Sequence, residues 1–414
     1  MKKGSKALIL AGGFDQIALI RGLQKRNYET ILVDYTDEPL AAKVSDHFIR
    51  ESTLDIDAVT RIAAQDKVDI ILTACTDQAL LTMAQVSESL KLPCHISWES
   101  ARNITNKRYM KSVFHTYGIP TAKNIVLHDN AIQVINTLHF PLIVKPVDCN
   151  SSKGIQRVNE IDKLNSSIQQ ARSLSRSGDV IVEEFLDGQE LSCDFYLYGD
   201  NVSFLSASFL HKAKNRDSFT ITACEYEPNI SNDILIQLNN IAKQIGLAFK
   251  IHNCFLLIQV IIKDGIVYVI ECSARMGGGA KYLLINRASG INSMEVYLDA
   301  ALGHPKAIEP RRYKQSFIQF YLYCRPGTYQ TSIGFEQAKE DGLIDDYYFF
   351  KSQNQRFTQA RNSGDRVAGI MISGESLLKF RDNPNYILNR LSVLDEKGQN
   401  ILINDLDYMI GNRD

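Results

Sequence analysis

The feature that most constrains the fold is a predicted β-hairpin that runs into a polar, glycine-rich segment. Two apolar, β-branched runs, Phe255–Ile262 and Ile266–Ile270, flank the dipeptide Asp264-Gly265. Asp-Gly between two such runs is a strong short-range signal for a hairpin. Pairing across this turn should bring Gln259 close to Glu271, which we expect just past the end of the second strand.

The end of this hairpin combines side chains that suit phosphate chemistry. Ser273 and Arg275 follow Glu271 at alternate positions, so an extended chain would point all three the same way. A carboxylate, an amide oxygen and a hydroxyl are hard oxygen ligands, and with an arginine beside them they suit Mg²⁺ that carries nucleotide phosphates. A plain hairpin with a polar end and a flexible tail at Gly277–Gly279 explains the same residues equally well.

Composition narrows the class of protein. The 414 residues allow about two to four domains with large cores. A chain with 45% hydrophobic and 22% charged residues is typical of a soluble globular protein. The formal net charge of −1 provides no broad basic field, which argues against nucleic acid as a partner. No apolar run reaches the roughly 20 residues of a membrane span, which argues against a membrane.

Cysteine and histidine usage gives no sign of a structural metal. The eight cysteines and eight histidines form no C-x-x-C pair and no metal-ligand spacing. This pattern predicts scattered buried thiols in a reducing cytoplasm. The apolar part of the N-terminal segment is too short for a signal peptide and indicates a first strand instead.

The first hundred residues alternate strands and helices. A strand at Lys6–Leu10 is followed by Gly12-Gly13, a helical pattern and a second strand, Thr30–Val33, that ends at Asp34. Asp34 lies where a dinucleotide fold places its ribose-binding acid, but the glycines do not form GxGxxG. The segment therefore predicts a parallel α/β domain, with NAD binding disfavoured.

The next segment contains two candidate phosphate-binding features. A helix begins at Asn106-Lys107 and stops at Gly118-Ile119-Pro120, and a buried strand ends at Lys145. The loop Asn150–Gly154 is small and polar, and loops of this kind offer backbone N–H groups to phosphate oxygens. A plain surface turn of the same composition is the alternative.

Two further stretches carry charge. A strand at Val180–Glu183 pauses and resumes at Leu191, which would leave backbone groups for an adenine edge and a carboxylate for ribose hydroxyls; a tight hairpin with solvated acids is the alternative. The segment His211–Arg216 concentrates positive charge and could face an anionic substrate or solvent. From about Arg311 a last unit contains no catalytic cluster, and we expect it to be structural.

Taken in this order, the segments resemble the ATP-grasp superfamily of carboxylate–amine ligases, including L-amino acid ligases and carbamoyl-phosphate synthetase-like proteins. The resemblance implies an α/β and α+β multidomain fold. Its parts would be a Rossmann-like pre-ATP-grasp domain (1–102), a small lid subdomain (103–185), a large ATP-grasp subdomain (186–310) and a C-terminal α+β domain (311–414).

The resemblance also implies roles for individual residues. Arg275 and Lys145 would be catalytic, and Gln259, Glu271 and Ser273 would bind Mg²⁺, with Mn²⁺ as a substitute. ATP would be bound by Lys107, Lys145, Ser151, Ser152, Lys153, Gly154, Glu183, Glu184, Phe185, Leu186 and Glu190. The substrate would meet His211, Lys212, Arg216, Gly278 and Lys281.

The implied activity is activation of a small carboxylate, for example an amino acid, as an acyl phosphate that an amine attacks, by an ADP-forming enzyme that could be a homodimer. Two departures keep alternatives open. The metal positions often hold an acid and an asparagine, whereas here they are Gln259 and Ser273. These departures leave a nucleotide-binding regulator without turnover as one alternative. A second alternative is a bicarbonate-using carboxylase, in which bicarbonate is the carboxylate.

Overall fold

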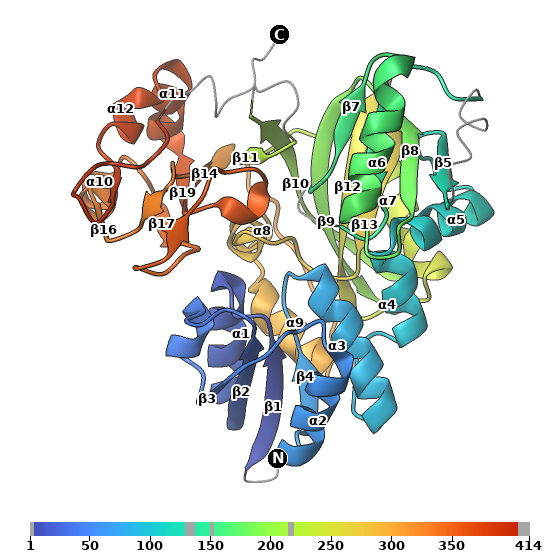
Figure 1. Ribbon diagram of the computed structural model, residues 1–414, viewed down its shortest axis with the longest axis horizontal. Coiled ribbons are helices and arrows are strands. Elements are labelled where there is room, and N and C mark those ends of the chain that lie inside the picture. Colours follow the sequence, from blue (N-terminus) through green and yellow to red (C-terminus); the bar gives the residue numbers. More distant parts are fainter. Residues whose placement is uncertain (1–3, 129–136, 150–152, 214–218, 405–414) are drawn as a thin grey trace.

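The computed structural model describes residues 4–128, 137–149, 153–213 and 219–404, and it contains three parts arranged around one long sheet (Figure 1). The N-terminal domain lies at the bottom of Figure 1, a small subdomain at the upper right and the C-terminal unit at the upper left. Within the described residues, no helix is long and apolar enough to cross a membrane.

The N-terminal domain is a parallel sheet in the order β3-β2-β1-β4 with helices packed against it. Apolar strands alternate with helices, so both faces of the sheet are buried. Its elements are β1 (Ser5–Leu10), α1 (Phe14–Gln24), β2 (Tyr28–Asp34), η1 (Leu40–Lys43), β3 (His47–Arg50), α2 (Ile56–Asp66), β4 (Ile70–Leu72) and α3 (Asp77–Leu90). The carboxylate of Asp34 accepts a hydrogen bond from the Gly12 N–H at 2.7 Å, so this acid holds the turn after β1.

The small subdomain is a four-stranded antiparallel sheet, in the order β5-β8-β6-β7, with one helix against it. Valines and leucines on one face of the sheet pack on that helix. The connecting helices and the subdomain comprise α4 (Trp98–Thr105), α5 (Lys107–Tyr117), β5 (Asn124–Leu127), β6 (Leu142–Pro146), β7 (Gln156–Val158), η3 (Ile161–Lys163), α6 (Leu164–Leu174) and β8 (Val180–Glu184).

The long sheet has eight antiparallel strands in the order β13-β12-β9-β10-β11-β14-β19-β17. Helices α7 (Asn232–Ala248), α8 (Lys281–Ser289) and α9 (Ser293–Ala301) belong to this part of the chain. Its strands are β9 (Gln189–Tyr198), β10 (Asn201–Lys212), β11 (Ile221–Tyr226), β12 (Cys254–Lys263), β13 (Ile266–Ser273), β14 (Phe317–Leu322), β17 (Asp346–Phe349) and β19 (Ala368–Ser373).

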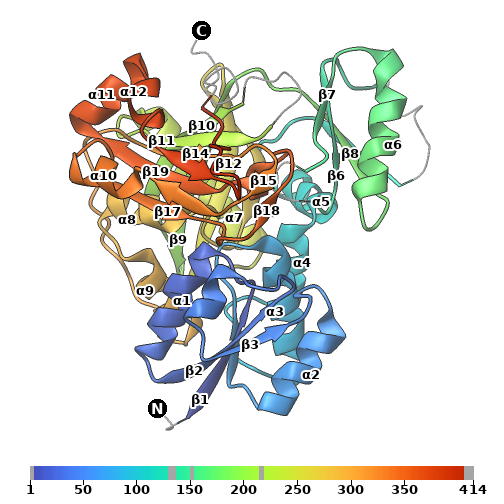
Figure 2. The same ribbon diagram turned by 60° about the vertical axis from the view of Figure 1, so that its left-hand side comes forward.

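The C-terminal unit is joined to the long sheet. Strand β14 pairs with β11, so β14, β19 and β17 continue the sheet that starts in the preceding segment, as Figure 2 shows from a second direction. Two short ladders and three helices complete the unit: β15 (Gly327–Thr328), β16 (Thr331–Ile333), α10 (Phe335–Glu340), β18 (Arg356–Phe357), η4 (Ser363–Asp365), α11 (Gly374–Asp382), α12 (Asn385–Leu388) and β20 (Ser392–Leu394). The expected boundary at 310/311 therefore separates segments that share a sheet, and the one at 102/103 lies inside α4.

The predicted hairpin is confirmed as β12 and β13. Asp264 and Gly265 both have positive φ, 50° and 76°, as a tight turn of this kind requires. Gln259 lies opposite Glu271, as expected from the turn. The expectation that Glu271 follows the strand is wrong, because cross-strand pairing continues to Ser273 and keeps Glu271 within β13.

Candidate active site

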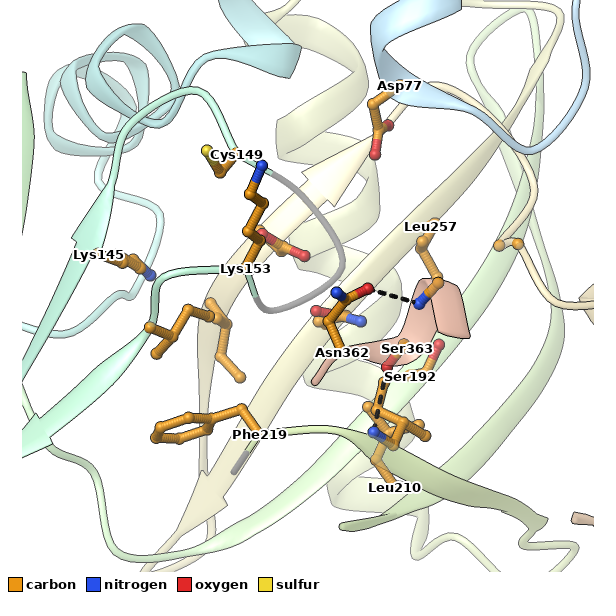
Figure 3. Close-up of a pocket in the computed structure, with 18 of the residues that line it drawn as sticks. Asp77, Lys145, Cys149, Lys153, Ser192, Leu210, Phe219, Leu257, Asn362 and Ser363 are labelled. Carbon is orange, nitrogen blue, oxygen red and sulfur yellow. Dashed lines mark hydrogen bonds between the residues drawn. The ribbon is translucent and has the colours of Figure 1, made fainter. Parts of the chain in front are cut away.

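A cavity of about 1170 Å³ lies where the small subdomain, the long sheet, the N-terminal domain and the C-terminal unit meet. Among the described residues that line it, lysines and arginines outnumber aspartates and glutamates. Figure 3 shows side chains from all these parts facing one space, with Asp77 above, Lys145 to one side and Asn362 opposite. The size and charge suit an anionic ligand together with a second small molecule.

The small subdomain supplies a buried cluster of one acid and two lysines. Nζ of Lys145, from β6, lies 2.5 Å from a carboxylate oxygen of Glu183, and Nζ of Lys111, from α5, lies 2.9 Å from the other. Burial would raise the pKa of Glu183, but the two ammonium groups outweigh it and hold that pKa at about 2. The carboxylate therefore fixes both lysines and does not point freely toward a ligand.

Two more lysines line the cavity beside this cluster. Lys107, the first residue of α5, donates to the carbonyl oxygen of Cys149 at 2.6 Å, and its Nζ lies 3.8 Å from Glu271. Lys153 lines the cavity and lies near Cys149 (Figure 3). Gly154 has a φ of +77° and packs against Pro146 without lining the cavity. Ser151 and Ser152 lie outside the described residues.

Aliphatic side chains also line the cavity: Ile143 and Ile155 from the small subdomain, and Leu257 and Ile261 from β12. Glu184, Phe185 and Leu186 line it as well. A flat, apolar purine ring suits aliphatic side chains of this kind.

The backbone after β8 leaves the Leu186 N–H available to a ligand. The N–H groups of Glu184 and Phe185 donate to the carbonyls of Lys123 and Pro141, both at 2.9 Å. The carboxylate of Glu184 accepts the N–H of His139 at 3.0 Å. Within the described part of the chain, the Leu186 N–H has no acceptor, so it is free to read a purine edge.

Glu190 and Lys212 form an ion pair on the cavity wall. They lie at the start of β9 and the end of β10. The residue expected to bind ribose and one expected to bind substrate are thus direct neighbours.

The site expected to bind a metal offers two side-chain oxygen ligands. Gln259 and Glu271 lie opposite each other and both line the cavity. The hydroxyl of Ser273 instead donates to Asp77 at 2.5 Å, so Ser273 does not fit the role of a ligand. Mg²⁺ keeps several waters and uses substrate phosphates where few protein ligands exist, and Gln259 with Glu271 fits that mode. The described residues contain no group of three or more His, Cys, Asp or Glu that could hold a metal.

Asp77 is a site residue that the sequence analysis missed. It is the first residue of α3, and both of its carboxylate oxygens accept hydrogen bonds from the guanidinium of Arg275, one of them at 2.6 Å. Burial would raise the pKa of Asp77, but Arg275 and Ser273 outweigh it and the pKa is lowered. The N-terminal domain thus holds the arginine that follows β13.

Asp15 is a second site residue that the sequence analysis missed. It lies after β1 in the first turn of α1 and accepts the Ala280 N–H at 3.0 Å. Strands β1 and β4 are neighbours where the strand order of the parallel sheet reverses, and ligands of such sheets bind at the carboxyl ends of strands at that point. The acids that follow β1 and β4 in the sequence could therefore have indicated that Asp15 and Asp77 belong to the site.

The expected substrate residues are scattered. Lys281 lines the cavity but is buried, 3.5 Å from the Asp194 carboxylate and 3.3 Å from the hydroxyl of Ser192. Gly278 lines the cavity. His211 pairs with Glu225 at 2.8 Å and is not among the described lining residues, and Arg216 lies outside the described part of the chain.

The C-terminal unit contributes directly to the cavity, so the expectation of a purely structural role is wrong. Asn362, Ser363, Arg366 and Lys351 line it (Figure 3 labels the first two). Gly279, which follows β13, lies against one of these residues. A Cβ on Gly279 would lie 2.2 Å from a terminal nitrogen of Arg366, so this glycine makes room for an arginine.

Comparison with known proteins agrees with this geometry. Residues 138–282 match the model of the ATP-grasp domain family. The chain is 22% identical over 301 residues to the carbamoyl phosphate synthase large chain of Clostridium beijerinckii, which covers 70% of this chain and 27% of that protein. It is 34% identical over 102 residues to the D-alanine–D-alanine ligase of Ralstonia pickettii, covering 24% of this chain and 30% of the ligase. The chain thus spans less than a third of the length of these curated relatives.

Solved structures resemble nearly the whole chain. The L-amino acid ligase from Bacillus licheniformis has a TM-score of 0.77 at 19% identity, over 96% of this chain and all of that one. The phosphoribosylglycinamide synthetase from Anaerococcus prevotii has a TM-score of 0.74 at 20% identity, over 95% of this chain and all of that one. This protein therefore contains an ATP-grasp domain, set within a multidomain α/β and α+β fold shared by these enzymes.

Proposed function

We propose that this protein is an ATP-dependent ligase that activates a small carboxylate as an acyl phosphate and joins it to an amine. The observation that carries the proposal is the convergence of Lys107, Lys145 and Arg275 with the Gln259–Glu271 pair around one cavity. Phosphoryl transfer needs mainly positioning and charge neutralisation, and these residues supply both.

The nucleotide would lie with its purine against aliphatic side chains of the cavity and its phosphates toward the lysines. The Leu186 N–H is available to the purine edge, and Glu190, held by Lys212 on the wall, would accept hydrogen bonds from the ribose hydroxyls. Glu183 holds the ammonium group of Lys145 in place. The positive charge of Lys145 is therefore already positioned before a phosphate binds. A divalent cation held by Glu271 and Gln259 would neutralise phosphate charge.

The proposed chemistry has two steps. A carboxylate oxygen of the substrate attacks the terminal phosphorus of ATP, the bond to the ADP oxygen breaks, and an acyl phosphate forms. The amine nitrogen then attacks the acyl carbon, inorganic phosphate leaves with the bonding electrons, and the nitrogen loses a proton. Arg275, held by Asp77, would stabilise charge on the transferring phosphoryl group.

The test is ADP release with Mg²⁺-ATP against the twenty amino acids, singly and in pairs, with bicarbonate as a separate condition. Release that needs a carboxylate and an amine supports the ligase. Release that needs bicarbonate would favour a carboxylase, and ATP binding without any release would favour a nucleotide-binding regulator.

The Glu271→Ala variant tests the site itself. We expect it to abolish ADP release while the protein remains folded, because it removes the only acid of the proposed cation site. Glu309→Ala is the matched control, since Glu309 is an exposed acid that is not among the described residues lining the cavity. Near wild-type activity in Glu271→Ala would refute the assignment. The proposed homodimer is checked separately by light scattering.

A further inference from the structure

Two cations of the C-terminal unit face the cavity without an acidic partner. Arg366 is only 8% exposed and Lys351 is half-buried, yet neither lies within 4 Å of a carboxylate of the described residues. The one side-chain hydrogen bond of Arg366 there is from Nε to the Tyr323 hydroxyl at 3.3 Å. A buried charge without a counter-ion is costly, and it persists where a ligand supplies the partner.

The surroundings of Arg366 preorganise it. Its guanidinium carbon lies 3.6 Å from the centroid of the Tyr321 ring, and Gly279 provides the space beside its terminal nitrogen. The Phe350 ring lies 6.2 Å from the Tyr321 ring, and Lys351, the next residue along the chain, lines the same cavity. A flat guanidinium supported on an aromatic face presents its N–H groups in a fixed fork.

The acids near this end are engaged elsewhere. Asp15 accepts the backbone N–H of Ala280, and Asp365 accepts the backbone N–H groups of Arg361 and Asn362. Asp34 and Asp365 influence Lys351 only through longer-range attraction. Among the described residues, Arg366 and Lys351 therefore keep their charged groups free of a direct carboxylate partner.

Resting on the proposed ligase function, we propose that Arg366 and Lys351 bind an oxyanion group of the non-nucleotide substrate. In the proposed reaction, Arg275, Glu271 and the lysines act on the carboxylate that is phosphorylated. The oxyanion at Arg366 and Lys351 is therefore a second group of the substrate, which is not phosphorylated. The substrate is then a small molecule with an oxyanion, either a carboxylate or a phosphate ester, next to its reacting amine or acid. The guanidinium of an arginine can donate two parallel hydrogen bonds to two oxygens of a carboxylate or of a phosphate ester.

The test is thermal unfolding of the full chain with Mg²⁺-ADP present. The probes are the twenty amino acids, their carboxamides, and glycerol phosphate. We expect at least one acid or the phosphate ester to raise Tm, and the matching carboxamide to leave it unchanged. For that compound, Arg366→Met should weaken binding about tenfold or more, Arg366→Lys should weaken it less, and Lys351→Met should weaken it also.

Two controls separate the outcomes. The exposed Arg361, on the same loop, should tolerate Arg361→Met without change. Mg²⁺-ADP should still stabilise Arg366→Met, so loss of oxyanion binding differs from failure of the nucleotide site and of the proposed function. The inference is overturned if acid and carboxamide act alike, if Arg366→Met binds the acid as wild type does, or if no probe raises Tm.

Without ligand, Arg366→Met should unfold at the same or a higher temperature than wild type, because it removes an uncompensated buried charge. A lower Tm in the free protein, with oxyanion binding retained, would assign Arg366 to packing alone.

Discussion

At the scale of single residues, the cavity is organised by charges whose partners are specific. Glu183 lies between Lys111 and Lys145, Asp77 binds Arg275, and Glu190 binds Lys212. Each pair restricts a cation that would otherwise be mobile. The sequence shows that these charged residues exist, but it does not show which of them neutralise one another.

Replacing Glu183 should destabilise the protein strongly. Glu183→Gln leaves two lysines buried without a counter-ion, and breaking a buried pair in this way costs roughly 3–5 kcal/mol. Urea unfolding at neutral pH would measure the loss. Glu184→Gln, the adjacent and more exposed acid, should cost about 1 kcal/mol or less; equal effects of the two variants would contradict the structural role of the cluster.

Asp15 should give a distinct pH dependence. Burial raises its pKa to about 7, and the Ala280 and Gly279 N–H groups with Arg275 and Arg366 offset this only in part. In the unfolded chain, Asp15 loses its proton near pH 4, whereas in the folded protein it keeps the proton until about pH 7. The free energy of unfolding therefore falls as pH rises from about 4 through 7.

We therefore expect Asp15→Asn to gain stability relative to wild type as pH rises, by up to about 1.4 kcal/mol per pH unit. Urea unfolding of both proteins at about pH 5, 6.5 and 8 measures the difference. A difference that stays constant across this range would show that Asp15 has an ordinary pKa.

At the scale of elements, helix α3 joins the N-terminal domain to the end of the β12–β13 hairpin. Asp77 at its first turn binds both Arg275 and Ser273, which lie 198 and 196 positions later in the chain. The hairpin end is thus positioned by an element outside the ATP-grasp domain. Elsewhere local patterns were sufficient: the helix after Asn106 begins and ends where the sequence predicts.

The Asp77→Asn variant tests this connection. The substitution weakens the hydrogen bonds and the ion pair that hold Arg275, but it changes no group proposed to bind the nucleotide. We therefore expect ADP release to fall about tenfold or more while the affinity for ADP changes little. Asp57→Asn is the matched control, because Asp57 is an exposed first-turn acid of α2. A parallel loss of ADP affinity would mean that Asp77 shapes the nucleotide site instead.

At the scale of the whole molecule, one sheet runs from the ATP-grasp segment into the C-terminal unit. A chain that ends at residue 310 would lose β14, β19 and β17 and expose the edge of β11. An uncovered edge with apolar faces promotes aggregation. We expect this truncated protein to aggregate, whereas the full chain stays dispersed; size-exclusion chromatography and circular dichroism measure this. A folded, dispersed truncation would show that the C-terminal unit is an independent domain.

The local backbone followed from the residues alone. Asp264-Gly265 between β-branched runs gave the hairpin and the Gln259–Glu271 pair, because turn geometry and alternation act over a few residues. The lysines at the start of α5 and in β6 were also found this way. The positions of Asp15, Asp77 and Arg366 were decided only by tertiary packing. Arg366 meets Gly279 because β14 and β19 extend the long sheet, and contacts between such distant residues depend on how whole sheets assemble, which no local pattern encodes.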